Sequence, residues 1–225
     1  MMNFFNLLNN HKSEPAPITN ETKTAKHSGN EYKNNVTLTG KVVHSFVTDK
    51  ITIITLGIFS PKPNFPKVLF FSNSRIKAAQ FKIGDLVRIE GNIQSSIVTP
   101  GKGLKEVSVF GESIEAMPGG EEIGGYNSFR NINRFELTGM VIDKTDWNNI
   151  MKLYVRTFKN NHLSIVPVDY YYTCSNPLRD IKAGDVVALK GSVQTKRKVF
   201  EDETVYFENY VATDIFLKDS SRKEP

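Results

Sequence analysis

The stretch IGDLVRIEGNIQ, from Ile83 to Gln94, recurs as AGDVVALKGSVQ from Ala183 to Gln194. A second pair of matches lies upstream in the same order, LTGKVV from Leu38 to Val43 and LTGMVI from Leu137 to Ile142. The two members of each pair are 99 to 100 residues apart, and two ordered matches at one spacing indicate an internal duplication. The chain therefore contains two similar units of roughly 85 to 100 residues, each large enough to bury a core.

Each unit shows the alternation that is typical of half-buried β-strands. Apolar and polar residues alternate from Val36 to Val42 and again from Val87 to Ile93, which is the period of a strand with one buried face. Glycine occupies an inward position in four such strands, at Gly40, Gly91, Gly139 and Gly191. Glycine there indicates a sharp bend or bulge, which favours a small closed barrel over a flat sheet.

A short helix is expected between the third and fourth strands of each unit. In the first unit, Ser72 or Ser74 would cap a helix that points Ile76, Ala79 and Phe81 inward. In the second unit, Asn176 is the expected cap and Pro177 occupies the first helical position.

Three strands, a short helix and two further strands is the order of an oligonucleotide-binding (OB) fold. The predicted fold is therefore all-β, with two tandem five-stranded Greek-key OB-fold barrels, each with one short helix between strands 3 and 4. PGGEEIGGYNS, from Pro118 to Ser128, is too rich in glycine to continue a strand or helix. The predicted division is a flexible arm at 1–33, barrels at 34–117 and 133–217, a Gly-rich linker at 118–132 and a polar tail at 218–225.

The charge of the chain favours a polyanionic partner. The formal net charge is +5 and the sequence pI is near 9.1. Residues 34–117 carry 10 Lys and Arg against 6 Asp and Glu, a net +4, whereas residues 133–217 carry 11 of each. The first unit is the more basic, although surface lysines alone do not identify a nucleic-acid partner.

Several function classes find no support in the sequence. No apolar run approaches the roughly 20 residues that cross a bilayer, and the single Cys174 cannot form an intramolecular disulfide, so cytoplasm is the expected location, with no membrane partner. The four histidines have no metal-ligand spacing to one another or to Cys174. No nucleotide-binding phosphate loop or nucleophile elbow occurs. We predict no enzyme, no catalytic residue, no cofactor and no metal.

The stretch FPKVLFFSNSRIKAAQFKIGDLVRIEGNIQ, from Phe65 to Gln94, resembles the third strand, helix and fourth strand of the bacterial and phage single-stranded DNA-binding protein family. QTKRKVF, from Gln194 to Phe200, is similar to that family's basic and aromatic hairpin between strands 4 and 5. The resemblance implies a protein that coats and protects single-stranded DNA without sequence preference, in replication, repair or recombination of a bacterial, phage or plasmid genome.

The two-barrel members of that family form dimers that supply four barrels, so the resemblance also implies a homodimer. The family in bacteria ends in an acidic, aromatic tip that recruits other proteins, whereas this sequence ends KDSSRKEP. Replication or recombination proteins are the expected partners, with recruitment through such a tip in doubt.

Binding a single strand without sequence preference requires aromatic rings for base stacking and cations for phosphates. Adjacent residues of a strand face opposite sides, so Phe70 and Phe71 cannot both be core, and the same holds for Tyr170 to Tyr172 and for Tyr206 with Phe207. Any single ring has a core position as its alternative role, and Trp147, in the predicted loop after the second unit's first strand, could instead fold over a barrel end. The resemblance to the single-stranded DNA-binding family implies stacking by Phe65, Phe71 and Phe200, and the other expected stacking residues are Trp147, Tyr171 and Tyr206.

The expected phosphate contacts come from both units. They are Lys67, Arg75, Lys102 and Lys105 in the first unit, and Arg156, Lys159, Lys196, Arg197 and Lys198 in the second. Three alternative functions stay open: an OB-fold interaction protein of the primosome type, a single-stranded RNA-binding protein, and a nuclease with a metal held by Asp143 and Asp146. Carboxylates at predicted loops are ordinarily turn formers, which disfavours the nuclease.

Overall fold

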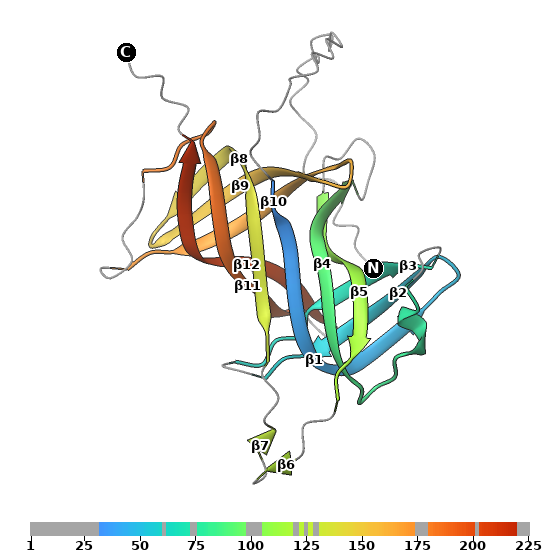
Figure 1. Ribbon diagram of the computed structural model, residues 1–225. Helices are drawn as coiled ribbons and strands as arrows, with labels where there is room; N and C mark the ends of the chain where they lie inside the picture. The colour runs from blue at the N-terminus through green and yellow to red at the C-terminus, as the bar shows by residue number, and fades with distance from the viewer. Residues whose placement is uncertain are drawn as a thin grey trace, which may run out of the picture. The chain divides into compact units, whose positions relative to one another are not determined.

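The computed structural model shows an all-β protein (Figure 1). It describes residues 32–59, 62–72, 76–97, 105–118, 122–123, 126–127, 131–173, 180–200 and 203–219. Ten of the described strands belong to one hydrogen-bonded sheet, in the order β11-β12-β10-β9-β8-β1-β2-β3-β5-β4. Residues Glu31–Pro225 form one compact unit.

The first five strands pair in a closed ring, which we call the first ring. β2 and β4 both pair antiparallel with β1, β3 pairs with β2, and β5 joins β4 to β3, with β3 and β5 parallel. This closure confirms that the strands do not form a flat open sheet. The strands of the first ring are β1 (Asn34–Val47), β2 (Ile51–Gly57), β3 (Lys67–Phe71), β4 (Leu86–Ile97) and β5 (Lys105–Ala116).

A second ring repeats this pairing scheme. β9 and β11 pair with β8, β10 pairs with β9, and β12 joins β11 to β10, again with one parallel pairing, between β10 and β12. The duplication inferred from the sequence therefore extends to the topology. The strands of the second ring are β8 (Asn133–Trp147), β9 (Ile150–Lys159), β10 (His162–Tyr171), β11 (Val186–Phe200) and β12 (Glu203–Asp219).

The two rings join through an antiparallel pairing of β1 with β8, centred on Val36 opposite Phe135. Asn34 exchanges two hydrogen bonds with the backbone of Ile93 at 2.8 and 2.9 Å, and Asn133 makes the same exchange with Val193. These equivalent contacts mark the duplication at the level of single side chains.

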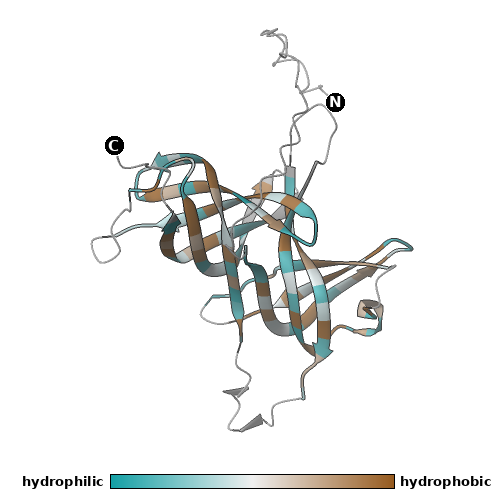
Figure 2. Cartoon of the chain, turned by 45° about the horizontal axis from the view of Figure 1, so that its top comes forward, coloured by the Kyte–Doolittle hydropathy of each residue, from teal (hydrophilic) through white to brown (hydrophobic). Residues whose placement is uncertain are grey.

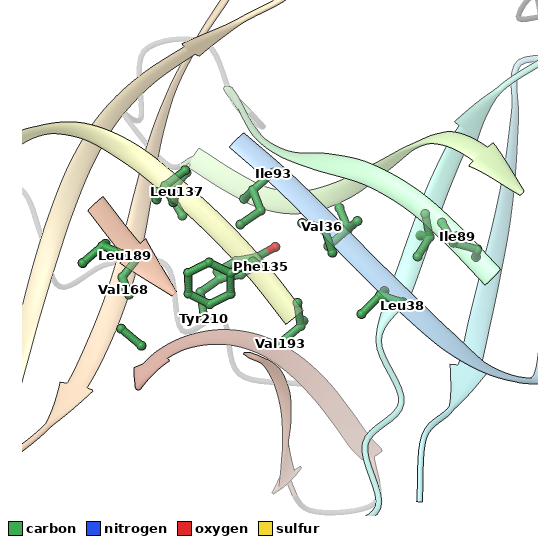
Figure 3. Close-up of a cluster of buried hydrophobic side chains, with 14 of the residues drawn as sticks. Val36, Leu38, Ile89, Ile93, Phe135, Leu137, Val168, Leu189, Val193 and Tyr210 are labelled. Atoms are coloured by element: carbon green, nitrogen blue, oxygen red, sulfur yellow. The ribbon is translucent and has the colours of Figure 1, made fainter. Parts of the chain in front are cut away.

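Hydrophobic and hydrophilic residues alternate along the strands (Figure 2), and burial follows this alternation. Leu38, Ile89 and Leu137 are almost fully buried, and Val36 and Phe135 lie in the same hydrophobic cluster (Figure 3). Burying each of these large apolar side chains is worth about 1.5 to 3 kcal/mol, so this cluster supplies the main stabilisation of both rings.

Two of the inward glycines lie at bulges, as the sequence indicated. The register of β4 against β5 shifts between Glu90 and Gly91, and that of β11 against β12 shifts between Lys190 and Gly191. A Cβ at Gly191 would lie 2.0 Å from the carbonyl oxygen of Val211, closer than any real contact. Only glycine allows the strands to approach so closely where they bend.

A further bulge near the end of each ring's first strand reverses the facing of the residues after it. The register of β1 against β2 shifts between Val42 and His44, and that of β8 against β9 shifts between Val141 and Asp143. One extra residue moves every following side chain to the opposite face. Residues that strict alternation would place in the core are therefore exposed.

The predicted helix between the third and fourth strands is wrong in the first ring. Among the described residues of this segment, 72 and 76–85, the only helical turn is a 3₁₀ turn, η1 (Ala78–Gln80), which follows Lys77 without a side-chain cap. Ala78 is buried and Ala79 is exposed, and one turn has too few residues to offset the cost of helix nucleation. Ser72 does not cap the turn, which begins after Lys77, and its hydroxyl donates to the carbonyl of Thr48. Ser74, Asn176 and Pro177 lie outside the described residues.

The predicted linker contains a small pair of strands, β6 (Glu122–Ile123) and β7 (Tyr126–Asn127), which pair only with each other. They lie between the end of β5 and the start of β8. The domain boundaries taken from the sequence stay a prediction. In the part of the chain that is described, no helix is long and apolar enough to cross a membrane.

Candidate nucleic-acid interface

The outward side chains of β1, β2, β3 and β5 form a surface that we call the first face. Its central row runs across all four strands, because the register pairs Phe46 with Ile53, Ile53 with Leu69, and Leu69 with Phe110. The next row is more polar and pairs His44 with Thr55 and Thr55 with Lys67. An apolar row therefore lies directly beside a polar row that carries the cationic side chain of Lys67.

Aromatic rings are exposed on this face. Phe46 is 52% exposed and Phe71 is 51% exposed, whereas Phe70 is 1% exposed, which confirms that only one of the adjacent phenylalanines belongs to the core. Phe71 stacks on Phe110 with ring centroids 5.3 Å apart and planes 25° apart. Phe65 meets Phe59 edge-on at 6.0 Å. The stacked pair holds a flat aromatic surface toward solvent.

A largely apolar hollow of about 520 Å³ lies on the first face. Its volume falls within the roughly 300 to 1,000 Å³ of typical ligand pockets, and a few polar groups border its apolar floor. Its lining residues are His44, Phe46, Ile53, Thr55, Phe65 and Lys67. Two residues predicted from the sequence, Phe65 and Lys67, thus lie in one hollow.

The second ring contributes to the edge of this hollow through the hairpin of β11 and β12. The backbone N–H of Phe65 donates to the Thr195 hydroxyl at 2.9 Å, and the N–H of Lys67 donates to Glu208 Oε1 at 2.6 Å. Thr195 and Glu208 lie opposite each other in the hairpin, and the basic stretch from Lys196 to Lys198 follows directly in the chain. The side chains of Thr195 and Glu208 thus hold the hairpin beside the first face.

Glu208 is the titratable group at this contact. Burial raises its pKa from an ordinary value of 4.5 to about 7, although hydrogen bonds from the N–H of Lys67 and the hydroxyl of Tyr210 act in the opposite direction. The same burial, with the charge of Glu208, raises the pKa of Tyr210 well above 10. Glu208, at the contact between the hairpin and β3, therefore gains a proton as the pH falls through about 7.

This raised pKa predicts that Glu208 stabilises the fold at low pH. Between about pH 4.5 and pH 7, the folded protein holds a proton that the unfolded chain has released, so the contribution is present below that window and is lost as the pH rises through it. Urea unfolding at the two ends of this pH window measures the contribution of Glu208 to the free energy of unfolding. Glu208→Gln is expected to reduce the difference in free energy of unfolding between the two pH values, and an unchanged difference would contradict the assignment.

The second ring has an equivalent surface, the second face, on β8, β9, β10 and β12. Trp147 pairs with Ile150, and Ile150 pairs with Tyr171. Trp147 is 70% exposed and Tyr171 is 36% exposed, whereas Tyr170 is fully buried. Trp147 is the last residue of β8, not a loop residue as the sequence suggested, and its exposure rules out a ring folded over the end of the barrel.

The fold of this chain is also found in a solved protein. The crystal structure of the wild-type single-stranded DNA binding protein from Thermus aquaticus aligns over 87% of this chain and 98% of its own, with a TM-score of 0.59 and 15% sequence identity. A deletion mutant of the same protein aligns over 86% and 97%, with a TM-score of 0.58 and 16% identity. The two proteins share a fold.

At the level of sequence, no protein-family model matches this chain. No curated protein matches it either.

The other predicted cations have different positions. The ammonium group of Lys159 donates hydrogen bonds to the Asn34 carbonyl and to Asn35 Oδ1 and lies 2.9 Å from Glu112 Oε2. These contacts join the two rings, so we leave Lys159 out of the proposed surface. Arg156 is exposed on β9 and its guanidinium contacts the sulfur of Met140 at 3.2 Å.

Several predicted site residues cannot be placed as side chains. Arg75 and Lys102 lie outside the described residues. Five others belong to described strands, but their side chains are not described: Lys105, Arg197, Lys198, Phe200 and Tyr206. Phe207, the neighbour of Tyr206, is 43% exposed, which agrees with the expectation that one ring of this pair is exposed.

Sequence reasoning missed Phe46 and Phe110. Strict alternation from Val36 places Phe46 inward, and only the bulge at Val43 turns it outward. Phe110 follows the buried Val109 in the same strand, so the rule that separates Phe70 from Phe71 could have identified it. Among the described residues, no three His, Cys, Asp or Glu side chains come together as metal ligands would.

Proposed function

We propose that each ring is an OB-fold barrel and that the chain binds single-stranded DNA without sequence preference and without catalysis. In this proposal the bases stack on the aromatic rings of the first face and the phosphates follow its cationic margin. Stacking bases on protein in place of one another would keep the strand extended and free of secondary structure. The domain boundaries at 34–117 and 133–217 are part of the same proposal.

The exposed aromatic row of the first face is the observation that carries this proposal. The stacked pair of Phe71 with Phe110 lies on β3 and β5, and the exposed ring of Phe46 lies on β1 of the same face. Ile53 and Leu69 separate Phe46 from Phe110 in the central row. Base stacking on such a ring is worth about 1 to 3 kcal/mol, and every base has a face that can stack. Exposing rings of this size to water without a ligand has no benefit for folding.

The cationic residues beside the first face also support it as the binding surface. Lys67 borders the hollow, and its backbone N–H binds Glu208 of the β11–β12 hairpin, which also carries Arg197 and Lys198 in its sequence. The protein from Thermus aquaticus that shares this fold is a single-stranded DNA binding protein, and that activity is consistent with a face of rings beside cations. The homodimer and the recruitment of replication or recombination proteins stay predictions.

A titration with labelled oligo(dT), matched oligo(rU) and duplex DNA tests the proposed function. We expect oligo(dT) to bind most tightly, because duplex bases are already stacked and cannot lie across the rings. Affinity is expected to fall about tenfold or more between low and moderate salt, because several phosphate contacts release counterions. Equal affinity for duplex would contradict stacking, and tighter binding of oligo(rU) would assign the surface to RNA.

A further inference from the structure

The second face has the geometry of the first face but a different central row. Ile150 pairs with Tyr171 as Ile51 pairs with Phe71, so the faces align strand by strand. The central row of the first face is Phe46, Ile53, Leu69 and Phe110, and the same positions of the second face hold Thr145, Lys152, Asp169 and Val211. The second face thus has an ion pair where the first face has apolar side chains.

Asp169 is the centre of this ion pair and is only 4% exposed. Its Oδ1 lies 3.0 Å from Lys152 Nζ, and its Oδ2 lies 3.8 Å from Lys196 Nζ. The side-chain amide of Asn209 donates to Oδ2 at 2.9 Å. A carboxylate so far from water is strongly unfavourable without its partners, so both lysines are engaged by it.

A second ion pair near the end of β8, Lys144 Nζ with Asp146 Oδ2 at 3.0 Å, does not belong to this face, because its residues pair with the inward Leu153 and Met151. The lysines that a phosphate would meet on the second face are Lys152 and Lys196, and both already neutralise Asp169. The rings of Trp147 and Tyr171 are exposed, so bases can stack on this face, but the phosphates gain little from it.

Resting on the proposed function, we propose that Asp169 keeps the second face in a low-affinity state, so that a single strand occupies the first face before the second. Asp169 acts through Lys152 and Lys196 and is therefore a positioning residue. Removing its charge with Asp169→Asn would release both lysines for phosphates. The amide keeps the size of the side chain and can still accept a hydrogen bond from Asn209.

Trp147 makes the order of binding measurable. It is the only tryptophan of the chain, and it lies on the second face beside Ile150. Stacking of a base on its ring changes its fluorescence, whereas occupancy of the first face leaves it unchanged. Anisotropy of a labelled oligonucleotide reports occupancy of either face, so the two signals together separate the two binding steps.

The experiment titrates the full chain with labelled oligo(dT) of about eight nucleotides, short enough to occupy one OB-fold at a time. In the wild type, anisotropy is expected to rise first and tryptophan quenching to follow at roughly tenfold higher concentration. In Asp169→Asn, quenching is expected to shift to lower concentration, toward the first step. In the double variant Phe46→Ala with Phe71→Ala, the first rise of anisotropy, which occurs without tryptophan quenching, is expected to disappear. The quenching of Trp147 at higher concentration is expected to remain.

Three results would decide against this account in different ways. Quenching that coincides with the first rise of anisotropy in the wild type would overturn the proposed order while leaving single-strand binding intact. Quenching that is unchanged in Asp169→Asn, with circular dichroism showing a folded variant, would overturn the role of Asp169. No anisotropy change with any oligonucleotide would overturn the proposed function, and this inference with it.

Discussion

Replacing Phe46 and Phe71 together with alanine is expected to weaken the binding of oligo(dT) by roughly 30-fold or more. Each ring is half-exposed on the first face, and the loss of a stacked base costs about 1 to 3 kcal/mol per ring. Because the side chains already contact water, their removal leaves no internal cavity, and the free energy of unfolding should change far less than the affinity. Fluorescence anisotropy of labelled oligo(dT) at fixed salt measures the loss.

A matched control comes from a ring outside both faces. Phe216 is 46% exposed on the part of β12 that pairs with Ala188 of β11, so Phe216→Ala removes about as much exposed aromatic surface as either single substitution of the double variant. It is expected to leave the affinity for oligo(dT) within about twofold of the wild type, since it removes no proposed stacking ring. If the control loses as much affinity as the double variant, or if the double variant loses none, the first face is not the stacking surface.

Gly191→Ala is expected to destabilise the protein by about 3 kcal/mol or more, the upper part of the range for overpacked cores. A Cβ there would lie 2.0 Å from the carbonyl oxygen of Val211 and 2.7 Å from the ring of Phe135. The carbonyl belongs to the backbone of the partner strand and cannot rotate away as a side chain could. Relief requires moving β11 from β12 at the bulge that closes the second ring.

Chemical unfolding measures this effect, with Ser192→Ala as the control. Ser192 is the next residue of β11 and is half-buried, so its change to alanine tests the same strand without the clash. A loss of less than about 0.5 kcal/mol is expected for the control, as for most substitutions away from special features. Equal stability of Gly191→Ala and the wild type would mean that the bulge does not hold the strands as closely as described.

The fold was largely predictable because the duplication is visible at the level of single residues. The repeated glycines at Gly91 and Gly191 mark bulges, and the alternation around Leu38 and Ile89 marks the core. The helix was not predictable in its true form, because a segment as short as η1 has no propensity signal strong enough to separate a 3₁₀ turn from an α-helical turn.

The candidate site was predictable only in part, and the bulges are the reason. Period 2 correctly separated Phe70 from Phe71, but it misplaces Phe46, because a single inserted residue reverses the facing of everything after it. The difference between the two faces depends on cross-strand pairs, such as Lys152 with Asp169. Such pairs become apparent only when the register of the two strands that carry them is known.

The position of a bound strand on the protein is the central claim, and photochemical cross-linking of oligo(dT) followed by mass spectrometry measures it most directly. Cross-links are expected first in the peptides that contain Phe46, Phe65 or Phe71, and at higher oligonucleotide concentration in the peptide of Trp147. Cross-links confined to the opposite side of the first ring, at Arg88 and Glu90 of β4, with none on the first face, would contradict the account.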